Sequence, residues 1–418
     1  MIRMTRKMLT PSALRSDNTV IVATKLIKRT ILAEMEKQAL AGGRPATLAR
    51  VLPRICLIIG QLGLGGTEKQ VVLLATGLRA RGADVTVVVL AGPGPRADAL
   101  REAGVPVVYL GLRAWPDWRA YPELVTVLGR LTRYLRRTRP DVVHGFLYHS
   151  YVLGAPAAWL AGVPAIVAGR RSLDDYKTGR HAVLAVERVA TWLTHKVVAN
   201  AEAVAACTRT SERVPAGKVT VIYNALPPEA FQPAAPAELD SAYPVLVCVA
   251  NLKPYKGLAD LVAAAGRLRD RGRPCTLVLV GEGPDEPHLR RLGARLGVDL
   301  RLLGARTDVT GLLARADVAV LPSHTEGMSN AVMEAMAAGR PVVATAVGGT
   351  PELLDGGRGR LVPPADPEAL ADAIAQVLED PGEAARMGAA ARDWCRANLN
   401  LDTLVQRHLA LYHDLLRS

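Results

Sequence analysis

Residues 316–349 have the sequence ADVAVLPSHTEGMSNAVMEAMAAGRPVVATAVGG, in which two short apolar runs flank a helical pattern. The runs lie near Val318–Pro322 and Val342–Ala346 and are rich in residues that favour buried strands. Between them, Ser329 suits a helix N-cap and Gly339 suits a helix end. The segment therefore predicts a strand, a glycine-polar loop, a helix and a second strand, which is the repeating unit of a parallel sheet.

The same alternation of strand and helix patterns fills both halves of the chain. It is interrupted at Asn224–Pro244, where five prolines rule out a regular helix or a central strand and predict a linker. We expect an α/β protein of two doubly wound, Rossmann-like domains that face each other across a cleft. The predicted parts are an N-terminal extension (1–50), a first domain (51–225), a linker (226–243), a second domain (244–400) and a C-terminal helix (401–418) that crosses back to the first domain.

The composition excludes several classes of protein. Of the 418 residues, 50% are hydrophobic and 22% are charged, which excludes a disordered or fibrous chain. The formal net charge of +13 suggests nucleic acid, a membrane surface or phosphorylated ligands as partners. Residues 1–50 contain 10 Lys and Arg against 3 Asp and Glu, so more than half of the excess lies in the extension. Aromatic residues make up only 4% and interleave with no basic motif, so we expect no nucleic-acid partner.

The basic extension allows three interpretations. Val20, Ile27, Ile31 and Met35 line one helical face between basic side chains, which suits an anionic membrane surface. The extension is otherwise a disordered tail or an artefact of an upstream start codon. The apolar run Val20–Val22 is too short for a signal peptide, and we expect no transmembrane segment. We therefore expect a cytoplasmic protein, peripheral at the inner face of the plasma membrane if the extension binds lipid.

A glycine-rich turn follows the first predicted strand. Gly60–Lys69, with the sequence GQLGLGGTEK, leads into a helix. The bare backbone N–H groups of Gly65 and Gly66 at a helix start suit a phosphate or a sugar. The spacing matches neither the dinucleotide fingerprint nor the P-loop, which disfavours a dehydrogenase or a P-loop enzyme. A plain strand-to-helix turn is the alternative.

Two loops of the second domain carry further candidate residues. Ala250–Gly257 (ANLKPYKG) offers Lys253 and Lys256, which suit a diphosphate, although a solvated loop is the alternative. The other loop contains Glu326 and leads to Glu334 in the following helix. A helix start favours a nearby carboxylate through its dipole, so the presence of Glu334 alone can be explained without a ligand. The two glutamates together with the glycine-polar loop indicate a ligand site.

These motifs resemble a known family. Glu326 and Glu334, with seven residues between them in EGMSNAVMEAMAAG, resemble the paired glutamates of the retaining nucleotide-sugar glycosyltransferases of family 4. These group 1 glycosyltransferases have the two-domain GT-B fold. The segments GLGGTEKQ, VIYNALPPEAF, VANLKPYKG, LVGEGP, LLGARTDV and ADVAVLPS occur in the family's order. The resemblance covers the chain from Ile55 to the C-terminus.

The resemblance implies a binding site for the donor. The backbone of Gly65 and Gly66 would lie over the donor phosphates and the reacting sugar. Lys256 would neutralise the leaving diphosphate, and Glu334 would bind the donor ribose hydroxyls. Many relatives carry Arg where this chain has Asn251, so full cationic stabilisation depends on Lys253. Glu326 would contact the donor sugar, and the loop of Gly304 to Arg306 would border the base. The donor sugar would also contact the backbone of Gly327, Met328, Ser329 and Asn330.

The acceptor side is predicted from residues at two strand ends. Relatives often have His-x-His where this chain has His144 and Phe146, so we place the acceptor-side histidine first at His149 and second at His144. Histidine has the pKa range for proton handling near neutrality, but a structural role is the alternative for each. Arg170 and Arg171 follow the fifth predicted strand. They either bind an anionic acceptor or cap the strand end at the surface.

The predicted reaction is sugar transfer from a nucleotide-diphosphate sugar to a glycan or lipid-linked acceptor, in cell-surface polysaccharide synthesis. UDP-linked sugars are the first expectation for the donor and GDP-mannose the second. The chain has no D-x-D motif, so we expect no metal and no cofactor. The resemblance implies front-side attack in which the departing phosphate helps to deprotonate the acceptor. The alternatives are a nucleotide-sugar epimerase on the same fold and a catalytically idle binding protein.

Overall fold

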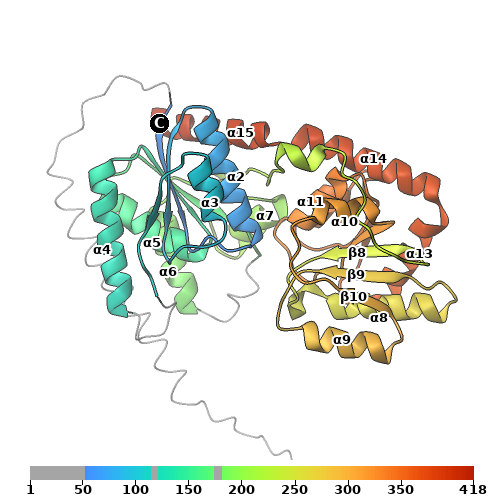
Figure 1. Ribbon diagram of the computed structural model, residues 1–418. Coiled ribbons are helices and arrows are strands. Elements are labelled where there is room, and N and C mark those ends of the chain that lie inside the picture. Colours follow the sequence, from blue (N-terminus) through green and yellow to red (C-terminus); the bar gives the residue numbers. More distant parts are fainter. Residues whose placement is uncertain (1–51, 114–120, 174–180) are drawn as a thin grey trace, which may run out of the picture.

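The computed structural model describes residues 52–113, 121–173 and 181–418, which form two α/β domains side by side (Figure 1). The predicted membrane-surface extension of residues 1–50 lies outside the described residues. No helix in the described ranges is both long enough and apolar enough to cross a membrane.

The first domain is built on a parallel sheet of seven strands in the order β3-β2-β1-β4-β5-β6-β7. Its strands are buried along most of their length, because helices cover both faces of the sheet. The strands are β1 (Arg54–Ile59), β2 (Asp84–Val89), β3 (Val107–Tyr109), β4 (Val142–Phe146), β5 (Ala165–Arg170), β6 (Lys196–Ala199) and β7 (Val219–Val221).

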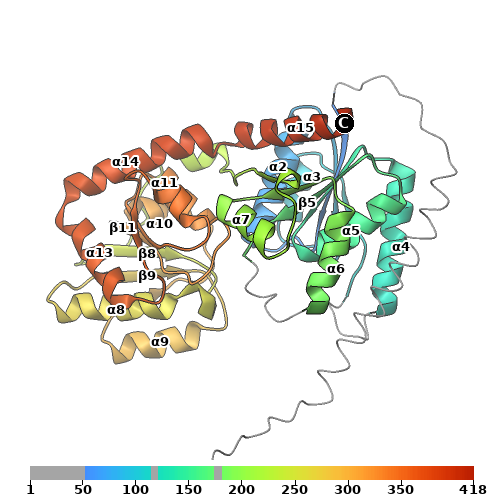
Figure 2. The same cartoon turned by 180° about the vertical axis from the view of Figure 1, so that it is seen from behind.

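Two layers of helices enclose this sheet, as Figures 1 and 2 show from opposite sides. Leu74 and Leu78 of α2 belong to the apolar core on one face, and Leu131 and Leu135 of α4 belong to the core on the other. The helices of the domain are α2 (Gly66–Ala80), α3 (Ala97–Glu102), α4 (Tyr121–Thr138), α5 (Tyr148–Leu160), α6 (His181–Trp192) and α7 (Glu202–Thr210), with a 3₁₀ turn η3 (Ala216–Lys218).

The second domain repeats the plan with a parallel sheet of six strands in the order β10-β9-β8-β11-β12-β13. These are β8 (Val245–Val249), β9 (Thr276–Val280), β10 (Asp299–Leu302), β11 (Val318–Leu321), β12 (Val342–Thr345) and β13 (Arg360–Val362). The helices are α8 (Leu258–Asp270), α9 (Glu286–Arg295), α10 (Val309–Arg315), α11 (Asn330–Ala337), α12 (Thr350–Leu354) and α13 (Pro367–Glu379), with a 3₁₀ turn η5 (Pro254–Lys256). The prediction of two doubly wound parallel sheets is confirmed.

The chain passes between the domains twice, and the two crossings touch. The first is the linker after Leu226, which contains the 3₁₀ turn η4 (Pro228–Phe231), and the second joins α14 (Pro381–Asn398) to α15 (Leu401–Arg417). The backbone N–H of Leu226 donates to the carbonyl of Leu399 at 2.8 Å, and Leu226 also forms an isolated parallel bridge with Asn400. Helix α14 packs on the second domain, whereas α15 lies along α2 of the first (Figure 1).

The domains also touch beside the cleft. The carboxylate of Glu352 in α12 accepts hydrogen bonds of 2.9 Å from the backbone N–H groups of Glu202 and Ala203, at the start of α7. Gly349 lies so close to Ala201 that an added Cβ would be 2.7 Å from the Cβ of that alanine. One apolar cluster accordingly includes residues of both domains.

In each sheet the order of strand addition reverses next to the first strand, between β1 and β4 and between β8 and β11. Ligands of doubly wound folds bind at the carboxyl ends of strands beside such a reversal. The segments that follow these four strands are the glycine turn (Gly60–Lys69), the turn from Phe146 to His149, the lysine loop (Ala250–Gly257) and the Glu326 loop (Pro322–Ser329). The fold therefore places four predicted site segments at its two switch points.

Candidate active site

Helix α11 forms the centre of the candidate site. The hydroxyl of Ser329 caps it by accepting from the backbone N–H of Val332 at 3.4 Å, as the sequence predicted. Glu326 lies three residues before the cap, and Glu334 lies in the helix, both only partly exposed. The remaining first-turn N–H groups make this end of the helix favourable for an anion.

Glu326 is held by two groups of its own domain. The ammonium group of Lys256 donates to Oε1 of Glu326 at 2.6 Å, and the hydroxyl of Ser323 donates to the same atom at 2.8 Å. Lys256 reaches this position because the next residue, Gly257, turns the chain with φ of +63°. Gly257 packs against the carbonyl oxygen of Pro322, and a Cβ at Gly257 would overlap with that oxygen. Strand β8 and strand β11 thus bring together the predicted lysine and the predicted glutamate.

A second glycine turn, at Gly348 and Gly349, packs against the backbone of the Glu326 loop. Gly348 has φ of +53° and lies against the carbonyl oxygen of Glu326, so closely that an added Cβ would overlap with that oxygen. The N–H of Gly349 donates to the carbonyl of Gly327 at 2.7 Å. Gly348 and Gly349 end the segment 316–349 that predicts the fold, but no role was predicted for this pair.

Glu334 is bonded across the cleft. The ammonium group of Lys69, in the first turn of α2, lies 2.5 Å from Oε1 of Glu334, and the two side chains are 26% and 18% exposed. Arg96 is close to this pair and donates to the carbonyl of Leu64 at 3.3 Å. Burial lowers the pKa of Arg96, while the charges of Glu68 and Glu334 raise it. Neither Lys69 nor Arg96 was among the predicted site residues, although Lys69 ends the glycine-rich segment Gly60–Lys69.

Amide side chains join the same two helix starts. The side-chain N–H of Asn330 donates to the carbonyl of Gly66 at 3.1 Å, and Oδ1 of Asn330 accepts from Gln70 at 3.1 Å and from Asn224 at 3.2 Å. Gln70 also bonds both backbone groups of Ala225. A Cβ on Gly66 would lie 2.7 Å from Nδ2 of Asn330, so any larger residue at this position would displace the Asn330 side chain.

The remaining donor-side candidates lie on exposed loops. Asn251 and Lys253 are both exposed, in the loop after β8. Gly304 has φ of +65°, and Arg306 forms an exposed ion pair with Asp308 through bonds of 2.8 and 2.7 Å. The structure therefore brings Lys256, Glu326 and Glu334 to one helix start, while Asn251, Lys253 and Arg306 face solvent.

The two candidate histidines have different surroundings. His144 is fully buried, stacks on Phe146 with 4.1 Å between ring centroids, and lies 2.9 Å from the hydroxyl of Tyr412. Burial and the nearby charges of His408 and Arg171 lower the pKa of His144 well below its usual range. His149 is partly exposed in the first turn of α5, and burial lowers its pKa to about 4. Of the two, only His149 is accessible to a ligand.

The prediction of a surface position for Arg170 and Arg171 is wrong, because both side chains are buried. Arg170 donates to both carboxylate oxygens of Glu212 at 2.7 to 3.0 Å and to Thr191 at 2.8 Å. Arg171 donates to Oδ1 of Asn224 at 2.6 Å and lies over the ring of Phe146. Internal partners therefore occupy the two guanidinium groups, and an acceptor anion has no open access to them.

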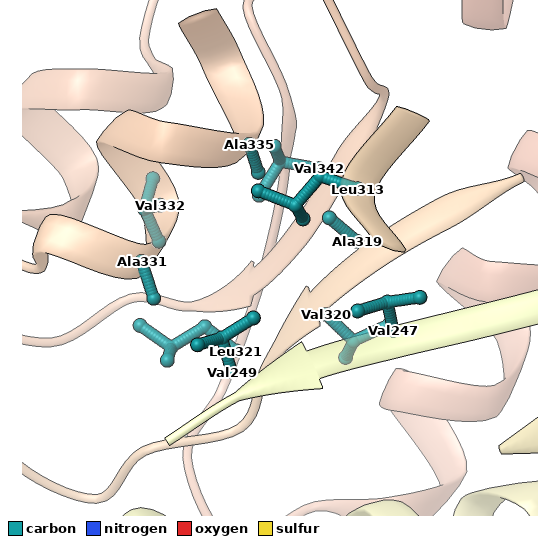
Figure 3. Close-up of a pocket in the computed structure, with 10 residues that line it drawn as sticks. All are labelled: Val247, Val249, Leu313, Ala319, Val320, Leu321, Ala331, Val332, Ala335 and Val342. Carbon is teal, nitrogen blue, oxygen red and sulfur yellow. The ribbon is translucent and has the colours of Figure 1, made fainter. Parts of the chain in front are cut away.

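A small apolar cavity lies behind α11 (Figure 3). Its volume is about 10 Å³, which is at the lower limit for one water molecule. Its lining side chains are all apolar and come from the strands β8, β11 and β12, from α10 and from α11 itself: Val247, Val249, Leu313, Ala319, Val320, Leu321, Ala331, Val332, Ala335 and Val342. This space belongs to the core that supports α11 and offers no polar group to a substrate.

Metal ligands do not gather in the described parts of the chain, where no group of three or more His, Cys, Asp or Glu side chains is arranged to hold an ion. Cations at the site are instead lysine and arginine side chains.

Comparison with known proteins gives matches along both domains. Residues 65–225 match the family model described as "Glycosyl transferase 4-like domain", and residues 243–380 match "Glycosyl transferases group 1". The glycogen synthase of Mycobacterium tuberculosis is 30% identical over 390 residues, which cover 84% of this chain and 91% of that protein.

A second relative is more similar over a shorter region. The GDP-mannose-dependent alpha-(1-6)-phosphatidylinositol monomannoside mannosyltransferase of M. tuberculosis is 38% identical over 192 residues. This region is 42% of the present chain and spans only 50% of the mannosyltransferase.

Solved structures share the fold. Anabaena Alr3699/HepE in complex with UDP has a TM-score of 0.74 at 21% identity, over 86% of this chain and 100% of that one. Sucrose-phosphate synthase from Thermosynechococcus elongatus has a TM-score of 0.74 at 21% identity, over 87% and 99%. Two facing doubly wound domains with the site between them define the GT-B class. Within this class, the chain belongs to the group 1 glycosyltransferases, family 4, as its motifs predicted.

Proposed function

We propose that this chain is a retaining glycosyltransferase that moves a sugar from a nucleoside diphosphate sugar to a glycan or lipid-linked acceptor. The observation that carries the proposal is the pair of glutamates around the start of α11, each bonded to a lysine: Glu326 to Lys256 and Glu334 to Lys69. A helix N-terminus flanked by cations suits the phosphates of a donor. Membership of the family supports the reaction class.

The donor is held from both domains in this proposal. Lys256 and the N–H groups at the start of α11 stabilise the diphosphate as it departs, and Glu334 accepts hydrogen bonds from the ribose hydroxyls. Gly65 and Gly66 allow the backbone of the first domain to approach the phosphates. Because these groups supply fixed positive charge and N–H donors, we propose that no metal is needed. Addition of EDTA is then expected to leave turnover unchanged.

In the transfer step, the bond between the anomeric carbon and the departing phosphate oxygen breaks, and the acceptor oxygen bonds to the same face of that carbon. The proton of the acceptor hydroxyl passes to the departing phosphate. His149 is the accessible histidine on the acceptor side, and its pKa of about 4 leaves it neutral and weakly basic near pH 7. This weak basicity supports the phosphate, and not the imidazole, as the proton acceptor.

The donor is either a UDP-linked sugar or GDP-mannose. Solved neighbours are complexes with UDP and UDP-glucose, whereas the mannosyltransferase relatives are named as GDP-mannose-dependent. A role in cell-surface polysaccharide synthesis, in the cytoplasm and at the inner face of the membrane, is part of the proposal. Deletion of residues 1–48 tests the membrane contact, which is contradicted if the shortened chain still associates with anionic vesicles as strongly as the full chain.

A donor screen tests the proposed function. The full chain is mixed with UDP-glucose, UDP-N-acetylglucosamine, GDP-mannose and ADP-glucose, and its unfolding midpoint is measured. A donor that binds the native state raises that midpoint, by several degrees when it is far above its Kd. The best donor is then incubated with and without lipid-linked acceptors, and the anomeric configuration of the product is read by NMR. Absence of both hydrolysis and transfer with every donor contradicts the proposal.

The same screen separates the two alternatives. An epimerase converts the donor to a second nucleotide sugar without any acceptor, whereas a transferase needs the acceptor to form product. An idle binding protein raises its unfolding midpoint with a donor but yields no product under either condition. Glu326, Glu334 and Lys256 are all present and in contact with partners, which favours the transferase.

A further inference from the structure

Lys69 joins the first turn of α2 to α11 across the cleft. Its ammonium nitrogen is 2.5 Å from Oε1 of Glu334, a residue 265 positions away in the sequence. Most of both side chains is shielded from solvent, with 26% and 18% exposed. An ion pair with this much shielding is screened less by salt than a surface pair, so it can fix the position of a carboxylate.

The place of Lys69 is not explained by helix stability. A cation in the first turn of a helix is opposed by the helix dipole, which favours acidic residues there, as Glu68 illustrates next to it. The ion pair with Glu334 offsets the unfavourable interaction of the Lys69 charge with the dipole of α2. Two further bonds hold the same helix starts together, from Gln70 to Asn330 and from Asn330 to the carbonyl of Gly66. The lysine is therefore part of a polar contact between the domains.

The ion pair determines how Glu334 presents its two oxygens. Oε1 is bonded to Lys69, and within the described parts of the chain no hydrogen bond to Oε2 is found. Arg96 adds a second positive charge near Glu334: burial lowers the pKa of Arg96, and the charges of Glu68 and Glu334 partly offset this lowering. A carboxylate that is fixed by one oxygen can accept hydrogen bonds from a diol with the other, without losing side-chain entropy on binding.

We propose that Lys69 is a positioning residue for the donor ribose. Lys69 holds the Glu334 carboxylate in the orientation that accepts hydrogen bonds from the ribose hydroxyls. Recognition of the ribose by the second domain then depends on its contact with the first domain. This inference rests on the proposed function, because it takes Glu334 to be the ribose ligand. It adds a residue of the first domain to a site that the family resemblance assigned to the glutamate alone.

Nucleotides with and without ribose hydroxyls test the inference. UDP, GDP and their 2′,3′-dideoxy forms are titrated into the full chain by calorimetry, and the tighter-binding base is then used with the variants. Lys69→Ala is expected to weaken ribonucleotide binding about tenfold, as loss of a fixed charge-assisted contact does, and to change dideoxynucleotide binding less than about twofold. The double variant with Glu334→Ala is expected to bind no more weakly than Glu334→Ala alone.

Two further variants separate positioning from a loss of folding. Lys69→Arg keeps the charge and is expected to restore ribonucleotide binding to within about threefold of the unaltered chain. Arg81→Ala is the matched control, because Arg81 follows the other end of α2 and pairs with Asp402 at 2.7 Å, away from the site. It is expected to leave nucleotide binding unchanged.

The outcomes distinguish this inference from the proposed function. If the unaltered chain binds neither UDP nor GDP, the proposed function fails and the ribose role fails with it. If it binds one of them and Lys69→Ala binds it equally well, only the inference fails. Equal weakening of ribonucleotide and dideoxynucleotide binding also overturns the inference, because it shows that Lys69 acts on the phosphates and not through Glu334.

Discussion

The hydroxyl of Tyr412, in the last helix of the chain, lies 2.9 Å from Nδ1 of His144, in the central strand β4 of the first domain. Both side chains are fully buried, and His408 from the same helix lies beside them with 5.7 Å between the two imidazole centroids. The C-terminal helix thus adds polar partners, and not only apolar area, to the core of the first domain. This arrangement favours the structural alternative for His144 over a role in proton handling.

Tyr412→Phe is expected to destabilise the protein. The change removes the partner of His144 Nδ1 and leaves that buried nitrogen unpaired, which costs about 1–3 kcal/mol. The free energy of unfolding is measured by urea denaturation at pH 7.5. Tyr243→Phe is the control, since Tyr243 is 46% exposed. Equal stability of both variants would show that the His144 contact contributes nothing.

Stability is expected to fall as the pH decreases below about 6.5. Burial lowers the pKa of His408 to about 3 and lowers that of His144 in the same direction. Between the unfolded and folded pKa values the unfolded chain binds more protons, so each such histidine lowers the free energy of unfolding by up to about 1.4 kcal/mol per pH unit. The loss begins near pH 6.5, and the range above pH 7 is unaffected by these groups.

The variant His408→Leu tests the origin of this pH dependence. The free energy of unfolding is compared at pH 7.5, 6.5 and 5.5, above the range where most carboxylates titrate. The variant is expected to lose less stability between pH 6.5 and 5.5 than the unaltered chain does. An identical slope in both proteins would mean that His408 does not titrate in the way its burial predicts.

Glu334→Ala and Lys256→Ala are each expected to reduce turnover at least tenfold. The first removes the proposed acceptor for the ribose hydroxyls, and the second removes the positive charge proposed for the leaving group and leaves Glu326 without its 2.6 Å partner. Initial rates with the donor from the screen provide the measurement. Glu368→Ala, on the exposed face of the same domain, is the control with an expected normal rate. Normal rates in both site variants would remove these residues from the mechanism.

Gly348→Ala is expected to reduce turnover more than tenfold. The new methyl group would overlap with the carbonyl oxygen of Glu326 and displace the loop that carries that glutamate. Gly357→Ala is the matched control, because Gly357 also has positive φ, of +77°, but nothing lies within 4 Å of its added Cβ. Both variants are destabilised by backbone strain of about 1 kcal/mol, because alanine disfavours positive φ. A difference in turnover between them is therefore caused by the displacement of Glu326.

Asn251→Arg is expected to tighten binding of a nucleoside diphosphate several-fold. Asn251 is exposed on the lysine loop, and an added guanidinium group there can pair with phosphate in the two-point geometry that asparagine lacks. Lys253→Ala is expected to weaken binding by a similar factor if Lys253 supplies the missing charge. Calorimetric titration at two salt concentrations is the measurement, and both effects are expected to shrink at the higher salt.

The sequence predicted the elements and the motif loops well, because these depend on local patterns. The apolar run at Val318–Pro322 and the Ser329 cap each identified an element within a residue of its observed position. The switch points follow from strand order, which brings Lys256 and Glu326 together at neighbouring strand ends. These inferences needed only the period of the apolar residues and the rules of parallel sheets.

Contacts between distant segments were not predictable in the same way. Lys69 and Glu334 meet because two helix starts approach across the cleft, and no local pattern of either segment specifies that meeting. The position of Arg170 after a predicted strand left an anion-binding role and a surface cap as alternatives, but Glu212 and Glu187 neutralise its side chain inside the domain.

The contact of Leu226 with Leu399 and Asn400 gives the molecule a single joint. Two crossings that are bonded at one place connect the domains at one point of the backbone, whereas the other described contacts between the domains, such as Lys69 with Glu334 and Glu352 with α7, are noncovalent. A rotation of one domain relative to the other that keeps the contact at Leu226 therefore has to break these noncovalent contacts.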